Sequence, residues 1–153
     1  MGEGSTEIYF YHLERRTLDD VLPTLLEKSL KRGWRAAVQA ASEERVEALD
    51  TLLWTYRQES FLPHGTARDG RAALHPIYLT AGDDNPNAAH VRFLVDGARL
   101  ADASPYLRVA YVFDGRDQTA VAQARVAWQA AKAQGGAVSY WQQDAEGRWQ
   151  QKA

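Results

Sequence analysis

The side chains that could carry out chemistry are few in this sequence. It contains no cysteine and four histidines, His12, His64, His75 and His90. No two of them have the i, i+4 spacing of a helical zinc site, and there is no thiolate to act as a ligand or nucleophile. We therefore expect neither a bound metal ion nor covalent catalysis.

An acidic pair, Asp83-Asp84, is the remaining candidate for acid–base or metal chemistry. It lies between Gly82 and Asn87, among residues that favour turns, so a solvated turn is the preferred interpretation. The alternative hypothesis is a metal-dependent enzyme of nucleotide or nucleic-acid chemistry that uses Asp83, Asp84 and His64.

The turn after the first predicted strand argues against a nucleotide cofactor. Residues 12–17 include no glycine, whereas a dinucleotide-binding turn needs glycines so that the backbone can approach the pyrophosphate. The G-x-x-x-x-G-K-[ST] pattern of a P-loop and the G-x-S-x-G pattern of a hydrolase are also missing. These absences favour an interaction module over an enzyme.

The charge balance argues against a protein that coats nucleic acid. The 153 residues include 18 Lys+Arg and 20 Asp+Glu, a formal net charge of −2, whereas nucleic-acid-binding domains are usually basic. A second alternative is direct nucleic-acid binding through a local basic patch. Its candidate residues are Arg15, Arg16, Lys28, Lys31, Arg32 and Arg35.

Three features of the sequence favour a cytoplasmic protein. The lack of cysteine fits a reducing compartment, and no apolar run reaches the ~20 residues that cross a bilayer. Residues 1–7 lack the basic and then apolar order of a signal peptide. We expect residues 1–6 to be a disordered lead-in and residues 7–153 to form a single domain.

Hydrophobic periodicity predicts alternating strands and helices. Strands are predicted at 8–11, 34–41, 76–80, 91–95, 107–113 and 138–141, and helices at 18–32, 43–56 and 118–134. This order predicts an α/β domain with a Rossmann-like three-layer α/β/α architecture and a mixed, mostly parallel sheet.

The stretch from Leu49 to Gly65 carries large apolar groups where a loop is usually polar. Val46, Leu49, Leu53 and Tyr56 share one face of the predicted helix, which we expect to be buried. Trp54 lies outside that face, and the segment Phe61, Leu62, Pro63 and His64 follows. Aromatic groups at a helix end favour a docking surface, although they could also cap the protein's own core.

The last predicted helix has two kinds of face. We expect the sheet to be covered by Ala120, Gln123, Val126, Ala127, Ala130 and Ala131. The opposite side carries Arg125, Trp128, Gln129 and Lys132 in one stripe. Two cations around an indole suit an acidic peptide that ends in an aromatic residue. The alternative is an ordinary solvated face with Trp128 folded against a neighbour.

The pattern L-D-x-x-L-W at 49–54, followed by E-S-F-L-P-H-G at 59–65, resembles the chi subunit family of bacterial DNA polymerase III. The resemblance also covers the strands at 8–13 and 76–80 and the final helix. It implies a non-catalytic replisome adaptor without a cofactor, joined to the polymerase clamp loader.

The resemblance also implies two partner sites. Trp54 and residues 61–64 correspond to the surface that receives a psi-type clamp-loader subunit or a helicase. Arg125, Trp128 and Lys132 correspond to the site for the acidic, phenylalanine-ended tail of single-stranded-DNA-binding protein. Val121 and Gln129 stand where some family members have lysine, so this chain has fewer cations there.

Overall fold

The structure is a computed structural model that describes residues 6–56 and 62–153. In this part of the chain, one eight-stranded sheet has the strand order β3-β4-β2-β5-β6-β1-β7-β8. The strands are β1 (Glu7–Leu13), β2 (Ala36–Gln39), β3 (His64–Thr66), β4 (Ile77–Thr80), β5 (Val91–Leu94), β6 (Arg108–Asp114), β7 (Ala137–Gln143) and β8 (Trp149–Gln151). The α-helices are α1 (Leu18–Lys31), α2 (Glu43–Trp54) and α3 (Gln118–Ala133), and two short 3-10 helices span Ala67–Asp69 and Ala72–Leu74.

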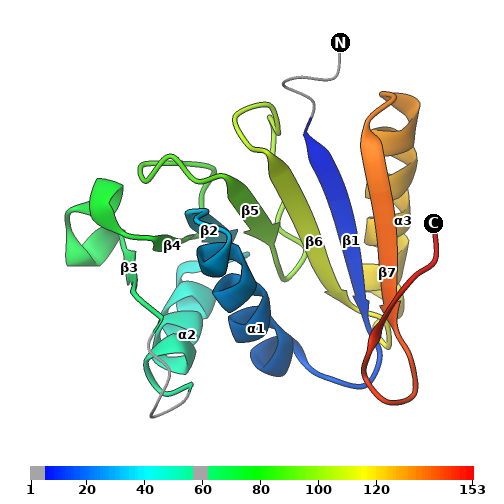
Figure 1. Cartoon of the computed structure of the whole chain (residues 1–153), viewed down its shortest axis with the longest axis horizontal. Helices are drawn as coiled ribbons and strands as arrows, with labels where there is room; N and C mark the ends of the chain where they lie inside the picture. The colour runs from blue at the N-terminus through cyan, green and yellow to red at the C-terminus, as the bar shows by residue number, and fades with distance from the viewer. Residues whose placement is uncertain (1–5, 57–61) are drawn as a thin grey trace.

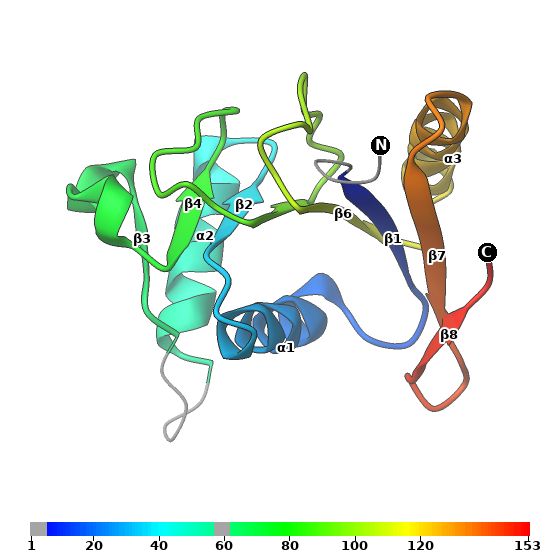
Figure 2. The ribbon, with the colours of Figure 1, turned by 45° about the horizontal axis from the view of Figure 1, so that its top comes forward.

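The sheet is parallel from β3 to β7, and β8 alone pairs in the antiparallel direction, with β7. Helices α1 and α2 cover one face and α3 covers the other (Figures 1 and 2). The predicted α/β class with a mixed, mostly parallel sheet is therefore confirmed. The short edge strand β3 was not among the predicted strands.

The helix starts are set by side-chain caps. Ser42 accepts a hydrogen bond from the backbone N–H of Arg45 and begins α2, as its residue type predicts. Thr17 caps α1 by accepting a hydrogen bond from the backbone N–H of Asp20. The helix begins at Leu18, as predicted, and Pro23 lies inside it.

The main core lies between the sheet and the pair α1 and α2. Strands β2, β4 and β5 are buried along their whole length, as expected for central parallel strands. On α2 the buried residues are Val46, Leu49 and Leu53, which confirms these three members of the predicted face. Tyr56, the fourth, lies beyond the end of the helix and is half-buried.

The predicted core face of α3 is largely wrong. Val126 is 66% exposed, and Gln123 and Ala130 are also exposed. The side chains that pack on the sheet are Ala120, Val121, Ala124, Ala127 and Trp128. Alanines are spread over more than half of the circumference of this helix, so periodicity did not single out the buried face.

Within the described residues, no helix is long and apolar enough to cross a membrane.

Two candidate partner-binding surfaces

The first surface is centred on the end of α2. Trp54 is the last residue of α2 and is 58% exposed. Its ring centroid lies 4.8 Å from that of His64, with the two planes inclined at 58°. An exposed indole held against a second ring is a typical centre for a protein–protein contact.

The buried side chain of His64 packs against the Trp54 ring and supports this surface. Its side chain is 0% exposed, with Nδ1 2.6 Å from the carbonyl oxygen of Leu62 and Nε2 3.1 Å from Oδ1 of Asp50. His64 Nε2 also lies 3.3 Å from the backbone carbonyl oxygen of Asp50, within hydrogen-bonding distance. His64 thus ties β3 to α2 one turn before Trp54.

The other residues predicted for this surface are placed unequally. Leu62 is buried at 3% exposure and Pro63 is half-buried, while Phe61 lies outside the described residues. Asp50 was part of the sequence motif, but its contact with His64 was not foreseen. The aspartate four residues before Trp54 was the available signal, since i and i+4 lie on one helix face.

The second surface is the flank of α3 next to β7. Arg125 and Lys132 are exposed, and the Lys132 ammonium nitrogen lies 5.4 Å from the Trp128 ring centroid. Residues 118–133 include these two cations and no acidic residue. The flank therefore has positive potential suited to an acidic ligand.

Trp128 belongs partly to the core on this side of the sheet. Its ring makes edge contacts with Phe10 at 5.7 Å and with Tyr140 at 5.6 Å. Burial raises the pKa of Tyr140, and the positive charge of Arg125 acts in the opposite direction. The Tyr140 hydroxyl lies 2.7 Å from Nδ1 of His12. Trp128 is consequently half-buried, and the two cations form the accessible part of the stripe.

The two surfaces lie far apart. Helix α2 is at one side of the sheet and α3 at the other, in both views of the molecule (Figures 1 and 2). Two partners could therefore bind without contacting each other's surface.

His64 and Asp84, two of the residues proposed for a metal-dependent enzyme, do not lie in one site. His64 pairs with Ile77 at the start of β4, whereas Asp84 follows the end of that strand. The Asp84 carboxylate accepts hydrogen bonds from the Tyr78 and Thr80 hydroxyls, both at 2.6 Å. Among the described residues there is no cluster of three or more His, Asp or Glu side chains that could hold a metal ion.

These hydrogen bonds determine the charge of Asp84. Burial alone raises the pKa of a carboxyl group, but the bonds from Thr80 and Tyr78 outweigh it and lower the pKa of Asp84 below its usual range. Burial, with a contribution from Asp84, raises the pKa of Tyr78 to about 12. Asp84 is therefore a charged structural acceptor.

The predicted basic residues are divided between two ends of α1. Arg15 and Arg16 precede the helix and Arg32 and Arg35 follow it, and 14 residues of helix span about 20 Å. The Arg32 guanidinium lies 4.0 Å from the Trp34 ring centroid, and Arg35 donates to the carbonyl of Asn87. The six cations consequently do not form one continuous patch.

Comparison with known proteins identifies the family. The model of the family described as "DNA polymerase III chi subunit, HolC" matches residues 5–139. The chain belongs to the DNA polymerase III chi subunit family. The predicted resemblance is thus confirmed, and the match includes both α2 and α3.

Two relatives carry names of the same chi family. "Probable DNA polymerase III subunit chi" of Rickettsia prowazekii (strain Madrid E) is 29% identical over 102 residues, which are 65% of this chain and 62% of the relative. "DNA polymerase III subunit chi" of Pseudomonas aeruginosa (strain PAO1) is 33% identical over 63 residues, which are 41% and 43% of the two chains. The matches therefore span less than two thirds of these relatives.

Proposed function

We propose that this chi-family chain is a non-catalytic adaptor of the replisome. It links the DNA polymerase III clamp loader, or a helicase, to the tail of single-stranded-DNA-binding protein. The observation that carries the proposal is the exposed cationic flank of α3, on a helix without acidic residues and far from Trp54. An adaptor needs two separate surfaces of this kind.

The tail of single-stranded-DNA-binding protein is the proposed ligand of Arg125, Trp128 and Lys132. Its acidic residues complement the two cations, and the fixed indole offers an apolar edge beside them. The cations are exposed, so salt screens their contribution over about 8–10 Å. The apolar contribution persists at high salt, and binding weakens with salt without disappearing.

The proposed partner of the other surface is a psi-type clamp-loader subunit or a helicase. Trp54 can bury up to about 150–250 Å² in such a contact. The contact between His64 and Asp50 supports Trp54 before a partner arrives, which lowers the entropic cost of association.

Fluorescence anisotropy with a labelled acidic tail peptide tests the adaptor function. We expect saturable binding that weakens between low and high salt, and a loss of affinity in Arg125→Glu. The control is Lys31→Glu, which reverses an exposed charge on α1, across the sheet. Equal affinity of the wild-type protein and Arg125→Glu would contradict the proposed tail site.

The metal-dependent enzyme receives no support from the site geometry, because Asp84 is engaged by Tyr78 and Thr80 and His64 lies at the other end of β4. Asp83→Asn provides the functional test. An unchanged adaptor activity in that variant is the expected result.

A further inference from the structure

The turn that joins β1 to α1 presents three successive backbone N–H groups to one oxygen atom. The backbone nitrogens of Glu14, Arg15 and Arg16 lie 2.9, 3.1 and 3.1 Å from the side-chain Oε1 of Gln143 and donate hydrogen bonds to it. Successive N–H groups that converge on one point are typical of turns that bind anions. The oxygen of Gln143, the last residue of β7, therefore lies where an oxygen of a bound anion would be expected.

This turn lies at the place where sheets of this class bind ligands. Strands β1 and β6 are parallel neighbours, and the helices that follow them, α1 and α3, cover opposite faces of the sheet (Figures 1 and 2). Open α/β sheets bind ligands at the carboxyl ends of two such strands, often with a phosphate at the start of the first helix. Thr17 caps α1 directly after the three N–H groups, so they have the position of a phosphate-binding turn.

The three donors exceed what a neutral acceptor needs. Gln143 is 5% exposed, and its side-chain nitrogen lies 3.5 Å from the carbonyl oxygen of Gly147. An amide oxygen has two lone pairs, whereas an ionised oxyanion offers more acceptor sites and a negative charge. Hydrogen bonds from N–H groups to an ionised acceptor are also stronger than those to a neutral one. The donor set at this turn consequently suits an anion better than it suits the amide that fills it.

The hairpin of β7 and β8 holds Gln143 against the turn. Nε of Arg15 donates a hydrogen bond to the carbonyl oxygen of Ala145 at 3.0 Å. Gly147, which has a φ of +80°, lies against the Arg16 side chain, because a Cβ at this position would be 2.9 Å from Nε of Arg16. These contacts fix the hairpin beside the turn, so Gln143 occupies its position in the absence of any ligand.

We propose that Gln143 acts as an internal ligand: its uncharged side chain fills a phosphate position at the start of α1 and keeps that position closed. The N-terminus of α1 carries a partial positive charge, and the exposed side chains of Arg15 and Arg16 add to it. Removal of the Gln143 oxygen should therefore create a site for a tetrahedral oxyanion such as phosphate. This contact involves neither partner-binding surface, so it does not rest on the proposed function.

The first experiment titrates inorganic phosphate at constant ionic strength and follows the backbone amide signals of residues 14–16 by NMR. In Gln143→Ala the three N–H groups lose their acceptor, so phosphate should shift these signals saturably. The wild-type protein should show no such shift. Gln142→Ala is the matched control, because Gln142 precedes Gln143 in β7 but donates to the Glu14 carboxylate at 3.0 Å. This variant should respond as the wild-type protein does.

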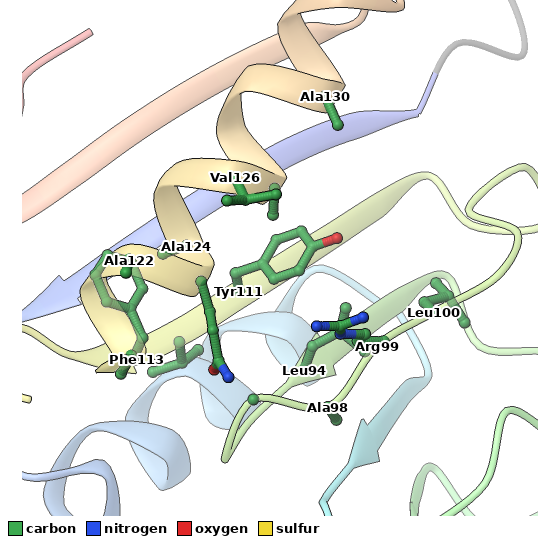
Figure 3. A pocket seen from close by; sticks show the side chains of 15 residues that line it. Leu94, Ala98, Arg99, Leu100, Tyr111, Phe113, Ala122, Ala124, Val126 and Ala130 are labelled. Atoms are coloured by element: carbon green, nitrogen blue, oxygen red, sulfur yellow. The ribbon is translucent and has the colours of Figure 1, made fainter. Parts of the chain in front are cut away.

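A separate pocket supplies an internal control for nonspecific attraction of phosphate. It lies between α3 and the segment that joins β5 to β6, and its lining is mainly apolar, with Leu94 and Tyr111 of the sheet and the charged side chain of Arg99 (Figure 3). Phosphate attracted by Arg99 alone should shift the amide signals of residues 97–100 equally in all three proteins. A shift at residues 14–16 that occurs only in Gln143→Ala is therefore specific to the vacated position.

The second experiment places a tethered anion on the same donors. Gln143→Glu keeps the size of the side chain, and its carboxylate would accept the three N–H groups, so its pKa should fall below the usual value of about 4.3. An NMR pH titration measures this pKa. Because a lowered pKa stabilises the folded state only while the carboxyl is ionised, the melting temperature relative to wild type should decrease as the pH falls below about 4.3. Phosphate should not shift the signals of residues 14–16 in this variant.

The two experiments give a clear decision. Phosphate-dependent shifts at residues 14–16 in Gln143→Ala alone, together with a lowered carboxyl pKa in Gln143→Glu, establish the closed phosphate position. The inference is overturned if folded Gln143→Ala does not respond to phosphate, or if the new carboxyl titrates at or above the usual range of glutamate. If Gln143→Ala does not fold, the pKa measured in Gln143→Glu decides alone. Neither result alters the proposed adaptor function, since the partner-binding surfaces are unchanged in these variants.

Discussion

Trp54 and Trp128 were both predicted to bind partners, and the structure places them in different environments. Trp54 is 58% exposed at the end of α2, above the buried ring of His64. Trp128 is half-buried between α3 and the sheet, in contact with Phe10 and Tyr140. The first can therefore contribute directly to an interface, whereas the second contributes mainly to stability and supports nearby cations. The following predictions test that contrast.

The largest expected effect is on the partner of the α2 surface. Trp54→Ala removes an exposed indole from the centre of the proposed interface and should weaken binding of a psi-type subunit or helicase by about 2–4 kcal/mol. Isothermal titration calorimetry measures the loss. Leu74→Ala removes another exposed apolar side chain, 72% exposed in the second 3-10 helix, and should leave binding unchanged. A similar loss in both variants would show that the Trp54 effect is not local.

Trp128→Ala should lower the free energy of unfolding by about 2–3 kcal/mol, because it opens a space beside Phe10 and Tyr140. Trp54→Ala should lower it by less than about 1 kcal/mol, as expected for an exposed position. Urea denaturation followed by circular dichroism gives both values. Trp128→Phe is the control that retains an aromatic ring. Equal stability losses at the two tryptophans would remove the contrast.

His64→Ala should lower the free energy of unfolding by about 1–2 kcal/mol, since a side chain that is 0% exposed loses its packing and its contact with Leu62. It should also weaken binding at Trp54 although the imidazole itself is covered. Asp50→Asn keeps the size and shape of the side chain, so it should lower the free energy of unfolding and the partner affinity by less than His64→Ala does. Unaltered partner binding in His64→Ala, measured on folded protein, would show that Trp54 does not need this support.

Arg125→Glu should reduce tail affinity about tenfold at low salt, or about 1.4 kcal/mol, since it replaces attraction by repulsion. The difference from wild type should shrink as salt increases, because the side chain is exposed. The free energy of unfolding of Arg125→Glu should equal that of the wild-type protein. Anisotropy across a salt series measures the effect, and a difference that is independent of salt would indicate a buried contact instead.

Lys132→Ala should have the smallest effect, about twofold in tail affinity, because exposed ionic contacts contribute about 0.2–1 kcal/mol. The dependence of affinity on salt should become shallower. The loss of the cation over the Trp128 ring should leave the unfolding transition nearly unchanged. A large loss of stability in this variant would place Lys132 in the core contacts of α3.

Predictions from the sequence were accurate where a local signal, such as the spacing of apolar residues along a helix, agrees with the tertiary packing. The spacing of Val46, Leu49 and Leu53 correctly located α2 and most of its buried face. Prediction failed on α3, where alanines spread over more than half of the circumference leave no narrow apolar stripe and Val126 is exposed.

The sequence by itself determined the family, through the motif around Trp54, and the α/β class, through the alternation of strands and helices. Residue types also supplied the cations of α3. Only the tertiary structure decided which side chains are accessible, since burial depends on what the sheet brings opposite each residue. The packing of Phe10 and Tyr140 covers part of Trp128, whereas Trp54 stays exposed beside the buried ring of His64. Each of these contacts joins residues from different elements, so the sequence pattern alone did not place them.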